Sequence, residues 1–197
     1  MTHYFDKEQT APLREEIIKV HLFNKEFQYL SASGLFSREH VDNATKLLIE
    51  KCELSSGQKV LDLGCGWGAV ALLIGERVSG LEITASDVNA RAASYTRKNA
   101  KKYKLPIKVK ASNLFEKLDD DYDVILTNPP YVAGRETCFA FIEGSFTHLK
   151  KGGNLQLVAR HSKGGKVLEG HMQELFGNVT TVAKGSGFRI YKSVKEY

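Results

Sequence analysis

The chain has 197 residues, 42% apolar and 26% charged, which is the size of one globular domain with an adequate core. Its 28 Lys and Arg exceed its 23 Asp and Glu by five charges, an excess that permits a polyanionic partner without requiring one. The three cysteines are widely spaced and form no C-x-x-C pair, which argues against a disulfide scaffold and a cysteine zinc site. The sequence has no apolar leader and no run of membrane-spanning length. We therefore expect a soluble cytoplasmic protein.

The first predicted elements form an N-terminal extension over residues 1–33. Two β-rich runs, 17–23 and 27–30, flank Asn24-Lys25-Glu26 and predict a β-hairpin. Ser37 is a suitable N-cap for a helix that runs to about Cys52, because the apolar residues between them recur at helical spacing. Residues 34–197 are expected to form one larger domain.

From Lys59 onward, short apolar strands alternate with helical stretches, which is typical of a parallel sheet covered on both faces. Two final strands are separated by only Gly185-Ser186-Gly187, which is too short for a parallel crossover, so they must pair antiparallel. The predicted fold class is α/β, a doubly wound sheet. Strands are expected near 59–63, 81–86, 107–110, 122–127, 153–159, 179–184 and 188–194, and helices near 68–78, 89–104, 136–149 and 164–176.

A glycine-rich turn joins the first strand of this sheet to its first helix. Strand 59–63 runs directly into Gly64-Cys65-Gly66-Trp67-Gly68-Ala69. Such a turn is where nucleotide-like ligands meet a parallel sheet. The pattern G-x-G-x-x-A also fits a dinucleotide-binding dehydrogenase, or a tight turn that binds nothing. The candidate cofactor-binding residues in this turn are Gly64, Cys65, Gly66 and Gly68.

Polar side chains at three strand ends indicate which cofactor fits. Asp62 lies two residues before the first glycine, and a carboxylate about 4 Å from a pyrophosphate would cost on the order of 4 kcal/mol but gain as much beside a cation. S-adenosylmethionine, with an ammonium, a sulfonium and no phosphate, is therefore favoured. Asp87 can accept hydrogen bonds from ribose hydroxyls, with Val88 as an apolar wall for adenine, or cap the next helix. Asn113 can bond the adenine edge or serve as a turn residue.

Two prolines follow the fourth strand of the sheet, in Asn128-Pro129-Pro130-Tyr131, a segment we call the substrate ledge. Each proline keeps its predecessor out of the helical region and neither offers an N–H, so the ledge is rigid and accepts hydrogen bonds. The Asn128 side-chain oxygen and the Pro129 carbonyl could hold the two hydrogens of a planar amine, with its lone pair aimed at a methyl donor. Tyr131 can stack on a flat substrate. A proline turn with an exposed aromatic is the alternative.

Basic residues gather in two sets that could contact RNA phosphates or simply form solvated faces. The first set lies in an acid-free stretch from Val88 to Phe115, at the expected third-strand edge of the sheet, away from the ledge. The second set lies on later loops and strands, nearer the ledge. The first comprises Arg91, Arg97, Lys98, Lys101, Lys102, Lys104, Lys108 and Lys110, and the second Arg135, Arg160, His161, Lys163, Lys166 and Arg189.

Together, the glycine turn, Asp87 and the ledge resemble the class I S-adenosylmethionine-dependent methyltransferases that modify exocyclic or amide nitrogens. With the flanking segments 34–42 and 176–190, the chain resembles the small-subunit ribosomal RNA guanine-N2 methyltransferase family with the small methyltransferase domain, in its compact single-domain archaeal type. The resemblance implies a seven-strand sheet ordered 3-2-1-4-5-7-6 with the last strand antiparallel, Phe36 as a further pocket residue, and ribosomal RNA as substrate. It is also compatible with a homodimer.

The sequence leaves alternatives open. An N-P-P-Y segment is equally typical of adenine-N6 and protein-glutamine methyltransferases. Asn113 stands where the resembled family commonly has Asp, Ala44 where Gly is expected, and Tyr131 where the bacterial guanine-N2 enzymes tend to carry Phe. A NAD-binding dehydrogenase and a non-catalytic S-adenosylmethionine-binding module are further alternatives. The six histidines show no ligand spacing, so we expect no metal.

Overall fold

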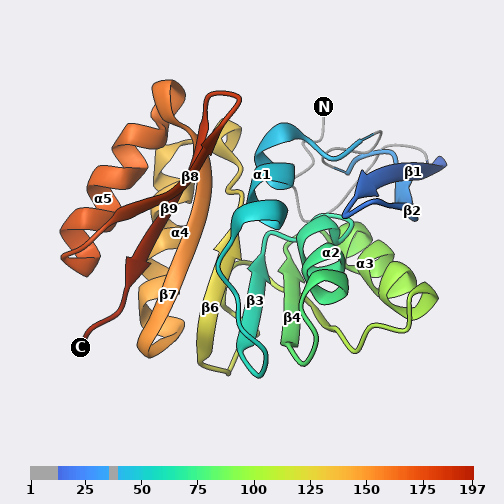
Figure 1. Cartoon of the computed structure of the whole chain (residues 1–197), viewed down its shortest axis with the longest axis horizontal. Helices are drawn as coiled ribbons and strands as arrows, with labels where there is room; N and C mark the ends of the chain where they lie inside the picture. Colours follow the sequence, from blue (N-terminus) through green and yellow to red (C-terminus); the bar gives the residue numbers. More distant parts are fainter. Residues whose placement is uncertain (1–12, 36–39) are drawn as a thin grey trace.

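The computed structural model describes residues 13–35 and 40–197. Phe36, expected to line the pocket, and Ser37, expected to cap a helix, lie outside the described residues. Figure 1 shows a central sheet with helices on both sides and a separate two-stranded hairpin beside it. Within the described parts of the chain, no helix has the length and apolar character needed to cross a membrane.

The central sheet has seven strands in the order β5-β4-β3-β6-β7-β9-β8. The first five strands in this order are parallel, and β9 runs antiparallel to both of its neighbours. Counted from β3, this is the predicted order 3-2-1-4-5-7-6, so the fold class is confirmed. The strands are β3 (Lys59–Leu63), β4 (Glu82–Asp87), β5 (Lys108–Ala111), β6 (Tyr122–Thr127), β7 (Leu149–Arg160), β8 (Thr180–Gly185) and β9 (Phe188–Val194).

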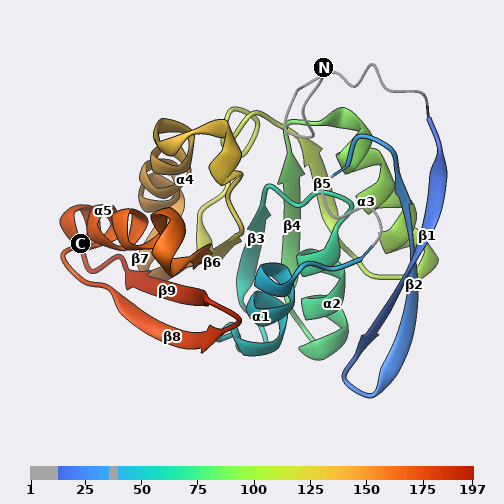
Figure 2. The ribbon, with the colours of Figure 1, turned by 90° about the horizontal axis from the view of Figure 1, so that it is seen from above.

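Helices cover both faces of the sheet, and the side chains of each strand alternate between two hydrophobic clusters. Val60 of β3 belongs to the cluster under α1 (Asn43–Lys51), α2 (Ala69–Arg77) and α3 (Ala90–Lys102), whereas Leu61 belongs to the cluster under α4 and α5. Figure 2 shows this two-sided arrangement from above. The remaining helical elements are η1 (Tyr131–Ala133), α4 (Arg135–His148), η2 (His161–Gly165) and α5 (Lys166–Phe176).

Helix α1 begins later than the sequence predicts. Its N-cap is Asp42, whose carboxylate accepts hydrogen bonds from the backbone N–H groups of Ala44 and Thr45 at 3.0 and 3.1 Å. A carboxylate at this position accepts hydrogen bonds from two of the helix's free donors. Its negative charge is also stabilised by the positive end of the helix dipole. The N-cap therefore lies five residues later than the predicted Ser37, and the helix has 9 residues, although its C-terminal end agrees with the prediction.

The N-terminal hairpin consists of β1 (Glu15–Leu22) and β2 (Lys25–Ala32). Its turn is Phe23-Asn24, both at positive φ, so the turn is one residue earlier and shorter than the predicted Asn24-Lys25-Glu26. Such a two-residue turn with both central residues left-handed matches the twist of the paired strands.

The hairpin shares the core of the sheet rather than standing apart from it. Tyr29 is fully buried, with its ring centroid 5.3 Å from that of Trp67, which lies in the glycine turn. Asn99 of α3 bonds β2 as a neighbouring strand would, because its side chain accepts from Leu30 N at 2.8 Å and donates to Leu30 O at 2.9 Å. The boundary at residue 33 stays a prediction, and the buried hairpin face shows that the extension is packed against α3.

Candidate functional site

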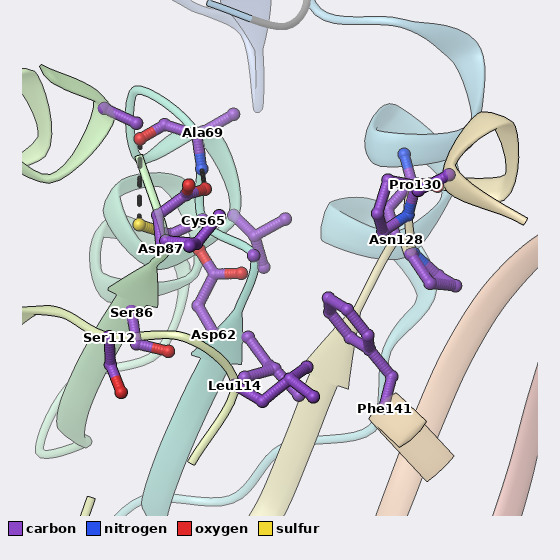
Figure 3. Close-up of a pocket in the computed structure, with 18 of the residues that line it drawn as sticks. Asp62, Cys65, Ala69, Ser86, Asp87, Ser112, Leu114, Asn128, Pro130 and Phe141 are labelled. Carbon is purple, nitrogen blue, oxygen red and sulfur yellow. Dashed lines mark hydrogen bonds between the residues drawn. The ribbon is translucent and has the colours of Figure 1, made fainter. Parts of the chain in front are cut away.

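The carboxyl ends of β3, β4 and β6 meet at a cavity of about 440 Å³. Figure 3 shows the cavity with the cofactor candidates on one side and the substrate ledge on the other. Gly68 and Tyr131 do not line it, and Phe36 lies outside the described residues. The predicted residues that do line it are Asp62, Gly64, Cys65, Gly66, Asp87, Val88, Asn113, Asn128, Pro129 and Pro130.

Asp62 combines a structural contact with a place in the cavity wall. Only 2% of the residue is exposed, and its Oδ2 accepts a hydrogen bond from Ala71 N, in the first turn of α2, at 2.9 Å. The helix cap Gly68 has no side chain, so Asp62 supplies the acceptor that this helix end lacks. Burial raises the pKa of Asp62 to about 7, the Ala71 N–H opposes this rise, and the neighbouring Asp87 adds to it.

Asp87, at the end of β4, holds the glycine turn in place. Its Oδ2 accepts from Gly66 N at 2.8 Å and its Oδ1 from Asn89 N at 2.9 Å. The cap of α3 is Asn89 rather than Asp87, since the Asn89 side chain accepts from the N–H groups of Arg91 and Ala92. Burial raises the pKa of Asp87 to about 6, against the effect of its two N–H donors. One lone pair on each oxygen stays available for a ligand hydroxyl.

The two carboxylates face the cavity without a base to balance them. Among the described residues that line the cavity there is no Lys, Arg or His. Nor does any described group of three His, Cys, Asp or Glu side chains have the arrangement of a metal site. Two acids in a mainly apolar cavity favour a cationic ligand and disfavour a pyrophosphate.

The glycines of the turn have different roles. Gly64 has φ +79°, and a Cβ on it would lie 3.3 Å from the Phe141 ring across the cavity. Gly68 has φ +99°, and a Cβ on it would meet Thr96 of α3 at 2.9 Å. Gly64 therefore keeps the cavity open, whereas Gly68 permits close packing of α2 against α3 without reaching the cavity.

Asn113 lies in the cavity wall with its amide nitrogen already bonded. Asn113 Nδ2 donates to Glu116 Oε1 at 2.7 Å. Glu116 therefore turns the Asn113 carbonyl oxygen away from itself and leaves it as the free end of the amide. An amide held in this way presents an acceptor, as an aspartate at the same position would.

On the substrate ledge, the Asn128 side chain is held by the opposite helix. Asn128 Nδ2 donates to Thr45 Oγ1 of α1 at 3.0 Å. Within the described part of the chain no donor reaches Asn128 Oδ1, and the residue lines the cavity. The neighbouring Pro129 is buried and Pro130 half-buried. The Asn128 oxygen is therefore open as an acceptor, and the binding of an amine by the ledge stays a prediction.

Tyr131 lies on the outer side of the ledge, in η1. It is 43% exposed, and its ring packs against Gly164 of η2 so closely that a Cβ on this glycine would lie 1.8 Å from the ring. Its neighbour Val132 is 73% exposed. The stacking of Tyr131 on a substrate stays a prediction, because the ring sits at the rim rather than in the cavity wall.

Thr45 and Phe141 are among the cavity residues that the sequence does not predict, and each lies against a predicted one. Thr45 bonds the ledge, and Phe141 of α4 faces Gly64. The pattern Asp42-x-x-Thr45 at a helix start is a cap signal that could have pointed to Thr45. Phe141 has no such signal, because its place depends on how α4 packs on the sheet.

Four of the eight residues in the first basic set make contacts within the protein. Lys98 pairs with Glu15 of β1 at 2.9 Å, and Lys102 donates to the backbone of β2 at Gln28 O. Arg91 and Arg97 donate to the backbone oxygens of Ser33 and Val109. These contacts attach the hairpin and β5 to α3. They give these basic residues a structural role that does not require RNA.

The sheet order, the glycine turn at its first strand and the proline ledge at its fourth define a Rossmann-like methyltransferase. The model of the family described as the methyltransferase small domain matches residues 26–192. The chain belongs to this family.

Relatives of the chain differ in length. It is 34% identical to the uncharacterized protein YbxB of Bacillus subtilis (strain 168), over 98% of both chains. It is 32% identical to the ribosomal RNA small subunit methyltransferase C of Haemophilus influenzae (strain PittGG), over 84% of this chain and 50% of that one. The chain thus spans about half the length of the methyltransferase C relatives, and the relative matched over its whole length is bacterial.

Solved structures agree on the fold. The T. thermophilus 16S rRNA N2 methyltransferase in complex with AdoMet and guanosine superposes with a TM-score of 0.81 at 24% identity, over 95% of this chain and 52% of that one. A methyltransferase from Pyrococcus furiosus superposes with a TM-score of 0.68 at 22% identity, over 78% and 82% of the two chains.

Proposed function

We propose that this chain uses S-adenosylmethionine to methylate RNA, and that its acceptor is the exocyclic N2 of a guanine in ribosomal RNA. The observation that carries the proposal is one cavity that has two buried carboxylates and no base at one end, and a ledge of acceptors at the other. The methyltransferase C relatives and the RNA-modifying structural neighbour support RNA as the substrate class.

The residues present fit S-adenosylmethionine better than NAD. Asp62 suits its ammonium group, since a buried carboxylate gains most from a cationic partner. The second lone pairs of Asp87 suit the ribose hydroxyls, and the Asn113 oxygen suits the adenine amino group. A pyrophosphate would instead meet two acids with no basic residue among the described cavity walls.

The cofactor supplies a methyl group on a positively charged sulfur. The substrate ledge orients the acceptor amine: Asn128 Oδ1 and the Pro129 carbonyl each accept a hydrogen bond from one of its two N–H groups. These hydrogen bonds become stronger as positive charge develops on the nitrogen, so they stabilise the transition state more than the ground state. Leu63, Phe141 and Leu114 provide apolar walls that exclude water from the reacting groups. The amine is itself the nucleophile, so the chain needs no nucleophile of its own. The new N–C bond would form as the S–C bond breaks, and the methylated nitrogen would then lose one of its two protons.

The second basic set is better placed for RNA than the first. Lys163 belongs to η2, which packs on the Tyr131 ring at the rim of the ledge, and Arg135 begins α4 directly after η1. Arg160, Lys163 and Lys166 are all exposed. Basic side chains around the rim would hold phosphates while a base reaches the ledge, and a flipped or single-stranded guanine fits this geometry.

The direct test incubates the protein and labelled S-adenosylmethionine with naked ribosomal RNA, small-subunit particles and release factors, followed by mass spectrometry of the digested products. Label in N2-methylguanosine supports the proposal. Label in N6-methyladenosine or in a glutamine side chain would show that the ledge binds one of the other planar amines. Binding of S-adenosylmethionine without methyl transfer would indicate a non-catalytic module. Calorimetry with NAD tests the dehydrogenase alternative, in which the protein would bind NAD.

A further inference from the structure

Three side chains form a chain of hydrogen bonds from the start of α1 to the ledge. Thr45 Oγ1 donates to Asp42 Oδ2 at 2.6 Å, and Asn128 Nδ2 donates to Thr45 Oγ1 at 3.0 Å. Thr45 is 6% exposed, so water competes little with Asp42 and Asn128 for hydrogen bonds to its hydroxyl. The other carboxylate oxygen, Asp42 Oδ1, caps α1. The helix cap and the substrate ledge therefore share one set of hydrogen bonds.

The direction of each bond follows from the chemistry of its acceptor. An ionised carboxylate can only accept, so the Thr45 hydroxyl proton is committed to Asp42. Toward Asn128 the hydroxyl oxygen can then only accept, so Asn128 must turn its NH₂ group to Thr45. The carbonyl end of the amide is thereby left for the cavity.

We infer that Thr45 is a positioning residue that, with Asp42, fixes the amide of Asn128 so that its oxygen faces the acceptor amine. The inference rests on the proposed function, because it assumes that the ledge binds an amine. An asparagine that is free to turn presents donor and acceptor ends alternately, and the donor end would repel the N–H groups of the substrate. Asp42 and Thr45 thus make the ledge selective for a substrate that donates.

Asp42→Asn tests the polarity of the chain of bonds without removing any group. An asparagine caps a helix as well as an aspartate does, so α1 keeps its N-cap. Its NH₂ group would now donate to Thr45, whose proton would be free to donate to Asn128 Oδ1. The Asn128 amide would then turn its NH₂ group into the cavity.

The kinetic experiment compares Asp42→Asn, Thr45→Val and Thr45→Ser with the wild type on the RNA substrate. We expect kcat to fall roughly 10- to 100-fold in Asp42→Asn and Thr45→Val, as is usual when a group that orients a site residue is lost. In both variants the cofactor Kd should stay within about 2-fold of the wild-type value. Thr45→Ser keeps the hydroxyl, so its kcat should recover. Unchanged kcat in Asp42→Asn, or equal losses in the valine and serine variants, would overturn the inference.

Nuclear magnetic resonance of the wild type and the same variants tests the bond without any substrate. The side-chain NH₂ protons of Asn128 should exchange slowly and show contacts to Thr45 in the wild type, and lose both features in Thr45→Val. Rapid exchange in the wild type would refute the bond itself. Wild-type protection together with failure to methylate guanine would instead reject the proposed substrate and keep the assigned orientation.

Discussion

Replacing Asp62 by asparagine should change stability and cofactor binding in opposite directions. Without ligand, the wild-type carboxyl has a pKa of about 7, raised by burial, whereas an unfolded chain ionises near pH 4. Between about pH 4 and 7 the unfolded state has lost this proton and the folded state has kept it, so rising pH lowers the free energy of unfolding. Over three pH units, at 1.36 kcal/mol for each unit, the free energy of unfolding falls by on the order of 4 kcal/mol.

Asparagine at position 62 avoids this loss, because it stays neutral and its oxygen can still accept from Ala71 N. Burial of an unsatisfied amide N–H would offset about 1–3 kcal/mol of the gain. We therefore expect the ligand-free Asp62→Asn variant to be more stable than the wild type by about 1–3 kcal/mol at pH 8 and not at pH 4.

Cofactor affinity should fall in the same variant. A carboxylate about 4 Å from a cation gains on the order of 4 kcal/mol at an effective dielectric constant of 20, so its loss should weaken binding roughly 100- to 1000-fold. Urea unfolding of the ligand-free protein at pH 4 and pH 8, together with calorimetry at pH 8, measures both effects. A folded variant that is less stable than the wild type at pH 8, or that binds S-adenosylmethionine with unchanged affinity, would refute the reasoning.

Three smaller predictions concern the walls and rim of the cavity. Gly164→Ala should lower the free energy of unfolding by about 1–3 kcal/mol through its clash with the ring packed there, while the control Gly170→Ala, which has open space in α5, should be neutral or stabilising in thermal unfolding. Asn113→Asp should keep the cofactor affinity measured by calorimetry, whereas Glu116→Leu should weaken it about 3- to 10-fold because the amide is no longer oriented; equal affinities in both would contradict this role. Lys163→Met should reduce the salt dependence of RNA binding by about one ion, and an unchanged slope would exclude it from the interface.

The sheet and the polar strand ends at the cavity could be predicted because their signals are local. Strand ends that carry Gly64, Asp87 and the Asn128 ledge belong to β3, β4 and β6, which are neighbours in the sheet. In a parallel sheet their carboxyl ends fall at one edge, and the reversal of strand order that places β6 beside β3 brings them together. The short link before β9, predicted as Gly185-Ser186-Gly187 and observed as Ser186-Gly187, likewise determines its antiparallel pairing.

What the sequence could not supply depends on contacts between distant segments. Ser37 and Asp42 are both acceptable caps by type, and the structure begins α1 after Asp42, where the Thr45 hydroxyl also meets the carboxylate. Lys98 resembles a solvated or RNA-binding residue until β1 is placed beside α3 with Glu15 facing it. Tyr131 is the last residue of the ledge, yet its ring packs on Gly164, more than thirty residues away.

In the proposed function, the Asn128 oxygen and the Pro129 carbonyl hold the acceptor amine. The most direct measurement compares wild type and Asn128→Ala for incorporation of labelled methyl groups into ribosomal RNA, with the cofactor Kd measured in parallel. We expect N2-methylguanosine from the wild type and a loss of roughly 100-fold or more in the variant, with cofactor affinity unchanged, as for removal of one group that stabilises developing charge. Equal turnover by the variant would contradict the assigned role of the ledge.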